Sequence, residues 1–144
     1  MKPMAASPFL DTNVLIYSVA DNDPRSEVAE ALLAAGGVVS VQVLNEFVAT
    51  ARRKLDRSWD EIVEALGAIR TLCPSPMAIA FDTHDSALRI AQTYKFHIYD
   101  ALIVASALEA GCDTLYSEDL QDGQVLEERL TVRNPFKVQE TPPN

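Results

Sequence analysis

The chain has 144 residues, a length that fits one domain large enough to bury a continuous core. Hydrophobic residues make up 48% and charged residues 23%, a composition that is typical of a globular protein and excludes a disordered one. The net charge of −9 repels nucleic acid at long range, so a nucleic-acid function would need a local basic patch, a metal ion or a basic partner.

The first half of the chain predicts short strands that alternate with helices. After a loose tail at residues 1–6, a first strand is expected over residues 7–10, followed by helices that begin near Val14 and after Asp23-Pro24. Residues 38–41 are a compact β-branched run, which predicts a second buried strand. The next helix carries an apolar stripe, formed by Leu44, Phe47, Val48, Ala51 and Leu55.

The second half continues this alternation. A helix is expected after Ser58, which has capping-box spacing to Glu61, and residues 77–81 predict a third strand before a helix capped by Asp82 or Thr83. Residues 99–110 are apolar nearly all round and predict a buried helix that ends at Gly111. Residues 114–116 predict a fourth strand and residues 131–133 an edge strand, before a loose tail at residues 138–144.

Short apolar strands between helices are typical of parallel sheets covered on both faces. We therefore expect an α/β fold, a single domain over residues 1–144 with three α/β/α layers around a mainly parallel sheet.

Four acidic side chains lie at boundaries between the expected elements. Asp11 follows the first strand directly, and Glu46 lies in the early turns of the helix after the second strand. Asp100 opens the buried helix, and Asp119 follows the fourth strand within three residues. Because ligands bind beyond the carboxyl ends of parallel strands, all four acids can lie on one edge of the sheet.

Each of these acids also has a purely structural interpretation. Asp11 could cap a helix, and Asp100 could interact with the dipole at a helix start. Glu46 points away from the apolar stripe of its helix, as a solvated glutamate would, and Asp119 lies in an acid-rich loop. Spacing alone leaves both interpretations open.

Four acids gathered at one edge would raise one another's pKa unless a cation neutralised them. Ligands that are all oxygen atoms favour a hard ion, so we expect Mg²⁺, with Mn²⁺ as a substitute, rather than zinc. The two histidines and two cysteines are scattered and offer no other ligand set. Such a centre activates water and stabilises charge on a phosphodiester, which predicts phosphodiester hydrolysis.

Four segments resemble, in order, the motifs of PIN-domain ribonucleases. They are FLDTNVL at residues 9–15, VQVLNEF at 41–47, YDALIVASA at 99–107 and TLYSED at 114–119. The match runs from about Phe9 to Asp122, and the size suits the VapC-type toxins of bacterial type II toxin–antitoxin pairs.

The resemblance implies an Mg²⁺-dependent endoribonuclease that acts on RNA, is commonly dimeric and is held inactive by a cognate antitoxin. By position, Asp11 and Asp100 would be the principal metal ligands, and Asp119 would complete the set directly or through water. Glu46 would bind the metal or orient the attacking water. The loop after the fourth strand also holds Asp122, so the fourth acid is Asp119 or Asp122.

Two further groups of residues are expected at this site. Asn13 and Ser117 would hydrogen-bond to the carboxylates and hold them in place. The basic run Arg52, Arg53 and Lys54 could contact RNA phosphates, although a solvated helix end at the C-terminal dipole is the alternative interpretation.

Two other functions stay open on the sequence. One is a catalytically silent PIN-like module that binds RNA or a protein, and the other is a receiver-type phosphoacceptor domain. A receiver needs its acceptor aspartate at the end of a middle strand, whereas Asp100 belongs to a helix start.

The cellular compartment is also inferred from the sequence. Cys73 and Cys112 have no metal-type spacing and are expected to be reduced core residues. The N-terminal residues lack a signal pattern, and no run approaches the ~20 apolar residues of a membrane span. We expect a cytoplasmic protein with no membrane partner, and the resemblance implies that it forms homodimers.

Overall fold

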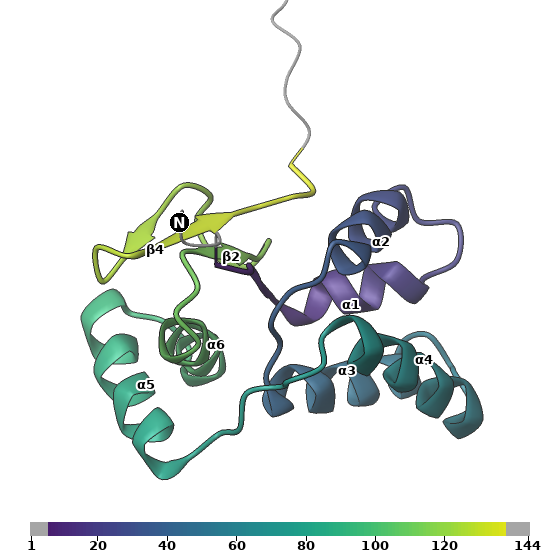
Figure 1. The fold of residues 1–144 in the computed structure, drawn as a ribbon, viewed down its shortest axis with the longest axis horizontal. Helices are drawn as coiled ribbons and strands as arrows, with labels where there is room; N and C mark the ends of the chain where they lie inside the picture. The colour runs from purple at the N-terminus through teal and green to yellow at the C-terminus, as the bar shows by residue number, and fades with distance from the viewer. Residues whose placement is uncertain (1–5, 138–144) are drawn as a thin grey trace, which may run out of the picture.

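Six helices and four short strands form the described part of this computed structural model, residues 6–137 (Figure 1). The strands are β1 (Phe9–Leu10), β2 (Thr114–Tyr116), β3 (Val125–Leu126) and β4 (Leu130–Arg133). The helices are α1 (Thr12–Val19), α2 (Ser26–Ala34), α3 (Val41–Arg53), α4 (Trp59–Leu72), α5 (Phe81–Tyr94) and α6 (Ile98–Glu109). The expected tails lie outside the described residues, apart from Ala6.

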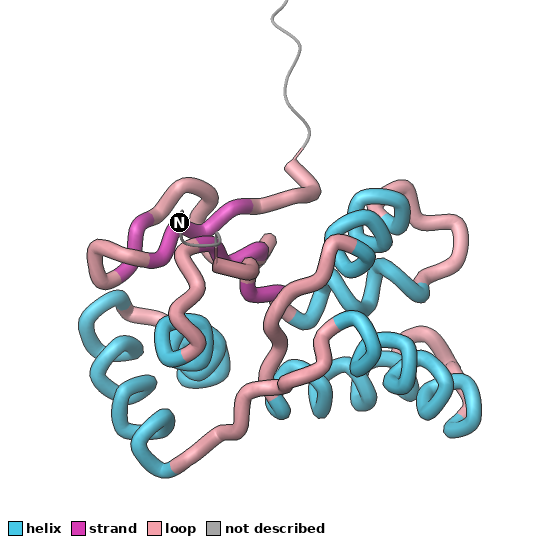
Figure 2. The backbone as a smooth tube through the Cα atoms, in the orientation of Figure 1, coloured by secondary structure: helices cyan, strands magenta, loops and turns pink. Residues whose placement is uncertain are grey.

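The strands form one sheet in the order β1-β2-β4-β3. The pairs β1–β2 and β2–β4 are parallel, and β3 pairs antiparallel with β4. Helices α5 and α6 pack together below the strands in the view of Figures 1 and 2, and α1, to the right of the strands, packs on α2 and α3. The predicted α/β fold with a mainly parallel sheet is confirmed.

Two of the expected strands are much shorter than predicted. Residues 38–41 and 77–81 contribute only isolated parallel bridges, Phe9 with Val38 and Ser40 with Met77. The prediction was wrong because α3 begins already at Val41: the Ser40 hydroxyl accepts a hydrogen bond from the Val43 amide at 3.2 Å. A serine cap therefore overrides the β propensity of the valines around it.

The strand expected at residues 131–133 exists as β4, but it is not an edge strand. It lies between β2 and β3, and β3 is the edge. The sequence did not predict β3 because two residues are too few to show an alternating pattern. Glu127 and Glu128, in the turn between β3 and β4, both have positive φ angles.

The core draws on the strands and on all six helices, and α6 contributes its longest buried run. Every residue from Ala101 to Ala107 is buried, as the apolar pattern of that segment predicted. Cys73 and Cys112 are buried free thiols, as expected of core residues. No helix within residues 6–137 is long and apolar enough to cross a membrane.

The core places the polar ends of several elements together. Strand β1 ends directly before α1, and the Asp11 amide donates a hydrogen bond to the Tyr116 carbonyl at the end of β2. The two parallel strands thus end side by side, in the register Leu10 with Tyr116. The loops that follow them carry Asp11 and Asp119.

Candidate functional site

Asp11 is a buried acid at the junction of β1 and α1, with 4% of its surface exposed. One carboxylate oxygen accepts a hydrogen bond from the Thr12 amide at 2.6 Å, and the other accepts from the Ser117 hydroxyl at 2.7 Å. Burial raises the pKa of Asp11 to about 7, and the charges of Asp119 and Asp100 add to the rise, against these two hydrogen bonds. A cation beside Asp11 would favour its ionised form.

Glu46 is held against the start of α1. The Thr12 hydroxyl donates to one carboxylate oxygen of Glu46 at 2.5 Å, and the Gln42 amide nitrogen donates to the other at 3.3 Å. The side chain is half-buried, so the interpretation of Glu46 as a solvated glutamate is wrong. Thr12 therefore connects the two acids: its hydroxyl donates to Glu46 and its backbone amide donates to Asp11.

Asp100 and Asp119 face the same region from α6 and from the loop after β2. Burial raises the pKa of Asp100, while His97 opposes the rise. Burial also raises the pKa of Asp119, and the nearby charges of Asp100, Glu118 and Glu46 raise it further. The charge of Asp100 thus raises the pKa of both Asp11 and Asp119, which indicates that these three acids lie near one another.

One cavity of about 300 Å³ joins the four acids. Asp11, Glu46, Asp100 and Asp119 all line it, and the other lining residues are Thr12, Asn13, Ala49, Thr50, Arg53 and Ile103. We call this the acidic cavity. The structure thus brings together the four side chains that the sequence placed at separate element boundaries.

The donor set suits a hydrated hard cation. The acidic cavity offers carboxylate, hydroxyl and amide oxygens, and Asp11 forms no ion pair within the described residues. In residues 6–137, no three His, Cys, Asp or Glu side chains are grouped closely enough to hold one ion between them. Mg²⁺ commonly keeps several water ligands and is bound through one or two carboxylates, which fits this arrangement.

Ser117 and Asn13 occupy different places in the site. The Ser117 hydroxyl donates to Asp11 and accepts from the Asp119 amide at 3.2 Å, so it joins two of the acids. The Asn13 amide does not bond to either acid: it donates to a carboxylate oxygen of Glu118 at 2.9 Å. Asn13 therefore holds the residue next to Asp119 rather than a cavity-lining carboxylate.

Glu118 is a residue that sequence reasoning did not single out. Besides the bond from Asn13, it accepts a hydrogen bond from the Tyr17 hydroxyl. Arg25 stacks over the Tyr17 ring at 3.7 Å, donates to its hydroxyl at 2.7 Å and lies 3.9 Å from Glu118. This network ties the Asp119 loop to α1 and to the start of α2. The only sequence signal was a third acid in the motif region.

Asp122 lies away from the other acids. One of its carboxylate oxygens accepts from the Asn134 amide at 2.9 Å, and the other lies 3.6 Å from the Lys137 ammonium. These contacts lower the pKa of Asp122, the opposite of the shift at Asp119. Of the two alternatives for the fourth acid, only Asp119 lines the acidic cavity.

The basic run at the end of α3 is divided between two environments. Arg53 lines the acidic cavity, whereas the Arg52 guanidinium lies 4.7 Å from the centre of the Trp59 ring. Arg52 also donates to the Arg57 carbonyl at 3.0 Å, and Lys54 is exposed at the helix end. Arg53 alone of the three adjoins the acids.

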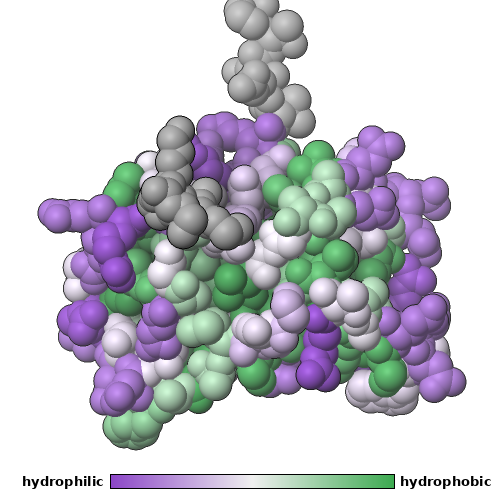
Figure 3. All heavy atoms as spheres, viewed as in Figure 1, coloured by the Kyte–Doolittle hydropathy of each residue, from purple (hydrophilic) through white to green (hydrophobic). Residues whose placement is uncertain are grey.

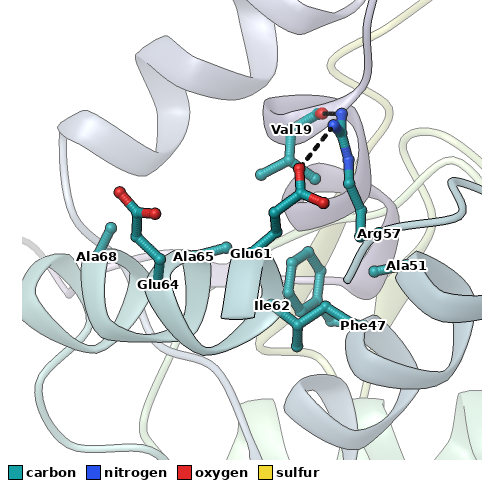
Figure 4. A pocket seen from close by; sticks show the side chains of 9 residues that line it. All are labelled: Val19, Phe47, Ala51, Arg57, Glu61, Ile62, Glu64, Ala65 and Ala68. Atoms are coloured by element: carbon teal, nitrogen blue, oxygen red, sulfur yellow. Dashed lines mark hydrogen bonds and ion pairs between the residues drawn. The ribbon is translucent and has the colours of Figure 1, made fainter. Parts of the chain in front are cut away.

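A separate cavity of about 360 Å³ lies between the end of α1, α3 and α4 (Figure 4). Its apolar lining includes Phe47 and Ile62, and its charged pair is Arg57 with Glu61, 3.6 Å apart. Arg57 also donates to the Val19 carbonyl. None of the four acids lines this cavity, so it is distinct from the acidic cavity.

The family model of the PIN domain matches residues 9–121. The chain belongs to the PIN-domain family. A comparison with curated proteins finds no match.

Solved structures share the fold of this PIN domain. VapC20 of Mycobacterium tuberculosis, a Sarcin-Ricin loop cleaving toxin, is 23% identical over 77% of this chain and 88% of its own, with a TM-score of 0.65. A toxin–antitoxin complex from Klebsiella pneumoniae is 19% identical over 92% of this chain and all (100%) of that chain, with a TM-score of 0.67. FitAcB of Neisseria gonorrhoeae is 16% identical, covers 91% and 99% of the two chains, and has a TM-score of 0.63.

Proposed function

We propose that this PIN domain is a Mg²⁺-dependent endoribonuclease that hydrolyses RNA phosphodiester bonds. The observation that carries the proposal is the acidic cavity, where four acids meet and burial raises the pKa of Asp11 to about 7. A buried acid without a cation costs free energy. Binding of a divalent ion would offset that cost.

Each residue of the cavity has a place in this chemistry. Asp11 and Asp100 would hold Mg²⁺ or Mn²⁺, with Asp119 as a ligand directly or through water. When bound, the ion lowers the pKa of water and offsets charge on the phosphoryl group. Glu46, which accepts a hydrogen bond from Thr12, would bind the ion or accept a proton from the attacking water. Ser117 keeps the Asp11 carboxylate in its orientation.

Arg53 is proposed to contact the RNA backbone. Its guanidinium can donate two parallel hydrogen bonds to a phosphate, and it stands at the edge of the acidic cavity. Because the net charge of −9 repels RNA at long range, such a local cation would favour binding. Arg52 is engaged by Trp59, so we assign it no RNA contact.

We further propose that the protein is the toxin of a toxin–antitoxin pair and acts in the cytoplasm. Its structural neighbours support this: one is a toxin that cleaves the Sarcin-Ricin loop, and another is a toxin–antitoxin complex. Two buried free thiols suit a reducing compartment. A cognate antitoxin is the corresponding protein partner.

A homodimer is proposed on the evidence of helix α5. Phe81 and Leu88 are seven residues apart on one face of α5 and are 77% and 41% exposed. Apolar side chains that share an exposed face are typical of an interface. Phe81→Ser should shift the protein from dimer to monomer in sedimentation at micromolar concentration. A wild-type protein that sediments as a monomer would contradict the proposal.

The nuclease proposal is tested with protein purified free of antitoxin. We expect it to cleave RNA with Mg²⁺, to lose cleavage in EDTA, and to regain it when Mn²⁺ is added. Asp11→Asn and Asp100→Asn should each reduce the rate by about 10² or more, because each removes a charged ligand. Asp122→Asn, outside the acidic cavity, is the matched control and should cleave normally.

The other outcomes discriminate among the remaining functions. Cleavage by Asp11→Asn at the wild-type rate would overturn the proposed metal site. RNA binding without cleavage by the wild type would favour a silent binding module, and labelling by acetyl phosphate would favour a receiver-type domain.

A further inference from the structure

A second cavity opens beside the acidic cavity, along the same face of α3. It measures about 460 Å³, and its lining includes Val41, Gln42, Asn45, Ile79 and Tyr99. Two residues of α3, Glu46 and Ala49, line both cavities, so the two are contiguous. We call the second one the Tyr99 cavity.

Tyr99 offers an aromatic surface at this position. It is 57% exposed and directly precedes Asp100, the proposed metal ligand. The Tyr99 amide donates to His97 Nδ1 at 3.2 Å, and the two rings lie 5.1 Å apart at 38°. The ring is therefore oriented by the first turn of α6 while it stays available to a ligand.

Apart from Glu46, which it shares with the acidic cavity, and the Tyr99 hydroxyl, the polar side chains of the Tyr99 cavity are the amides of Gln42 and Asn45. The Gln42 amide nitrogen donates to the Tyr99 carbonyl at 3.1 Å, which fixes that side chain and leaves its oxygen as an acceptor. The Asn45 side chain is exposed and makes no hydrogen bond within the part of the chain that the structure describes. Val41 and Ile79 form an apolar part of the wall of this cavity.

An aromatic ring, an apolar wall and neutral amides are what a nucleobase requires, because single-stranded RNA is recognised by stacking and by hydrogen bonds to base edges. The cavity contains no Lys or Arg, so it suits an uncharged base rather than a phosphate. Arg53, which would hold a phosphate, lines the neighbouring acidic cavity.

We propose that the Tyr99 cavity binds the base of a nucleotide that flanks the scissile phosphate, with Tyr99 stacking on the base and Gln42 and Asn45 contacting its edge. This inference rests on the proposed ribonuclease function and adds a determinant of substrate choice to it. Tyr99 is a binding residue here and takes no part in proton transfer.

The test compares Tyr99→Ala with Tyr99→Phe, which keeps the ring. Binding is measured by anisotropy with a short fluorescein-labelled single-stranded RNA of mixed sequence, and cleavage is measured as KM and kcat with total RNA. We expect Tyr99→Ala to raise Kd and KM about tenfold with little change in kcat, and Tyr99→Phe to stay close to wild type. Trp59→Ala is the matched control, because Trp59 is equally exposed (58%) but lines neither cavity.

A second arm of the test identifies what Tyr99 contacts. In an RNA made entirely of abasic nucleotides, the difference between wild type and Tyr99→Ala should disappear. Binding by Tyr99→Ala equal to that of the wild type would overturn the inference even if the protein cleaves RNA. Failure of the wild type to bind the RNA would overturn it as well.

The remaining outcome concerns a protein partner. If Tyr99→Ala changes the sedimentation of the protein, the cavity is an interface between copies and the inference is wrong. If binding depends on Tyr99 but the wild type cleaves no RNA, the base-binding part of the inference stands, while the nuclease proposal and the position of the base beside a scissile phosphate fail. The two proposals can therefore fail separately.

Discussion

At Asp11, burial and hydrogen bonding favour opposite protonation states of a single side chain. Hydrogen bonds from Ser117 and Thr12 favour its ionised form, but burial outweighs them and the pKa rises to about 7. In the absence of a cation, about half of the molecules would hold a neutral Asp11 near neutral pH. A bound cation would move that balance toward the carboxylate.

The raised pKa gives a prediction about stability without metal. The folded protein keeps the Asp11 proton up to about pH 7, whereas an unfolded aspartate loses it near its ordinary pKa of 3.8. The folded state thus binds more protons between these values, and the free energy of unfolding should fall as pH rises through that window. Asp11→Asn removes this pH-dependent fall in the free energy of unfolding. The variant should therefore be about 1–4 kcal/mol more stable than the wild type at pH 8.

This prediction is measured by urea unfolding in EDTA at pH 4 and pH 8. The two proteins should differ little at the lower pH. Asp122→Asn is the control of opposite sign, because contacts with Asn134 and Lys137 lower the pKa of Asp122. An Asp11→Asn variant that is less stable than the wild type at pH 8 would show that hydrogen bonding outweighs burial.

At the scale of elements, short polar residues decide where helices begin. Ser58 and Glu61 form the predicted capping box, with bonds of 3.1 and 2.9 Å between side chain and backbone. Ser40 starts α3 in the same way, with a bond to the Val43 amide. Both helices therefore begin where a local signal stands in the sequence.

Two glycines provide a matched test of local packing. A methyl group at Gly37 would come within 2.9 Å of the Leu10 side chain and of the Pro8 carbonyl, beside strand β1. A methyl group at Gly67 would meet nothing within 4 Å and would raise the helix propensity of α4. Gly37→Ala should therefore lower the stability by about 1–3 kcal/mol, while Gly67→Ala should raise it by about 0.5–1 kcal/mol.

Thermal unfolding of both variants, read by circular dichroism, checks this pair. Because Gly37 packs against β1, Gly37→Ala should also weaken cleavage by displacing Asp11, whereas Gly67→Ala should not. If Gly37→Ala melted at the same temperature as the wild type, the Leu10 side chain would have moved aside without a loss of stability.

The proposed function requires the whole molecule to bind an anion, RNA, while it carries a net charge of −9. On the face viewed in Figure 3, hydrophilic residues gather at both sides and apolar residues lie between them. The acidic cavity gathers four of the acidic side chains in one place. A divalent ion is the simplest way to lower that repulsion.

Binding of Mg²⁺ should therefore stabilise the folded protein as a whole. At about 100 times its dissociation constant, a ligand of the native state adds about 2.7 kcal/mol, which raises the melting temperature by several degrees. The increase should be larger at pH 8 than at pH 6, because the ion requires the ionised form of Asp11. Differential scanning calorimetry of the wild type and Asp100→Asn at both pH values measures this effect; an equal increase in the two proteins would place the ion elsewhere.

The sequence by itself determined the features that depend on neighbouring residues. These include the alternation of strands and helices, the capping box at Ser58, the buried helix α6 and the four boundary acids. Each follows from side-chain periodicity or from hydrogen bonds between residues a few positions apart. The four family motifs are likewise short runs of consecutive residues, so the sequence alone contains them.

Only the tertiary structure decided how distant segments meet. Asp11 and Ser117 are 106 positions apart, and the register of β1 on β2 brings them into contact. In the folded chain Asp122 also pairs with Lys137, and Asn13 donates a hydrogen bond to Glu118. Of the basic run at the end of α3, Arg53 is the residue that lines the acidic cavity. Sequence spacing cannot predict such choices, because which side of a loop or helix faces a cavity is set by packing between elements far apart in the chain.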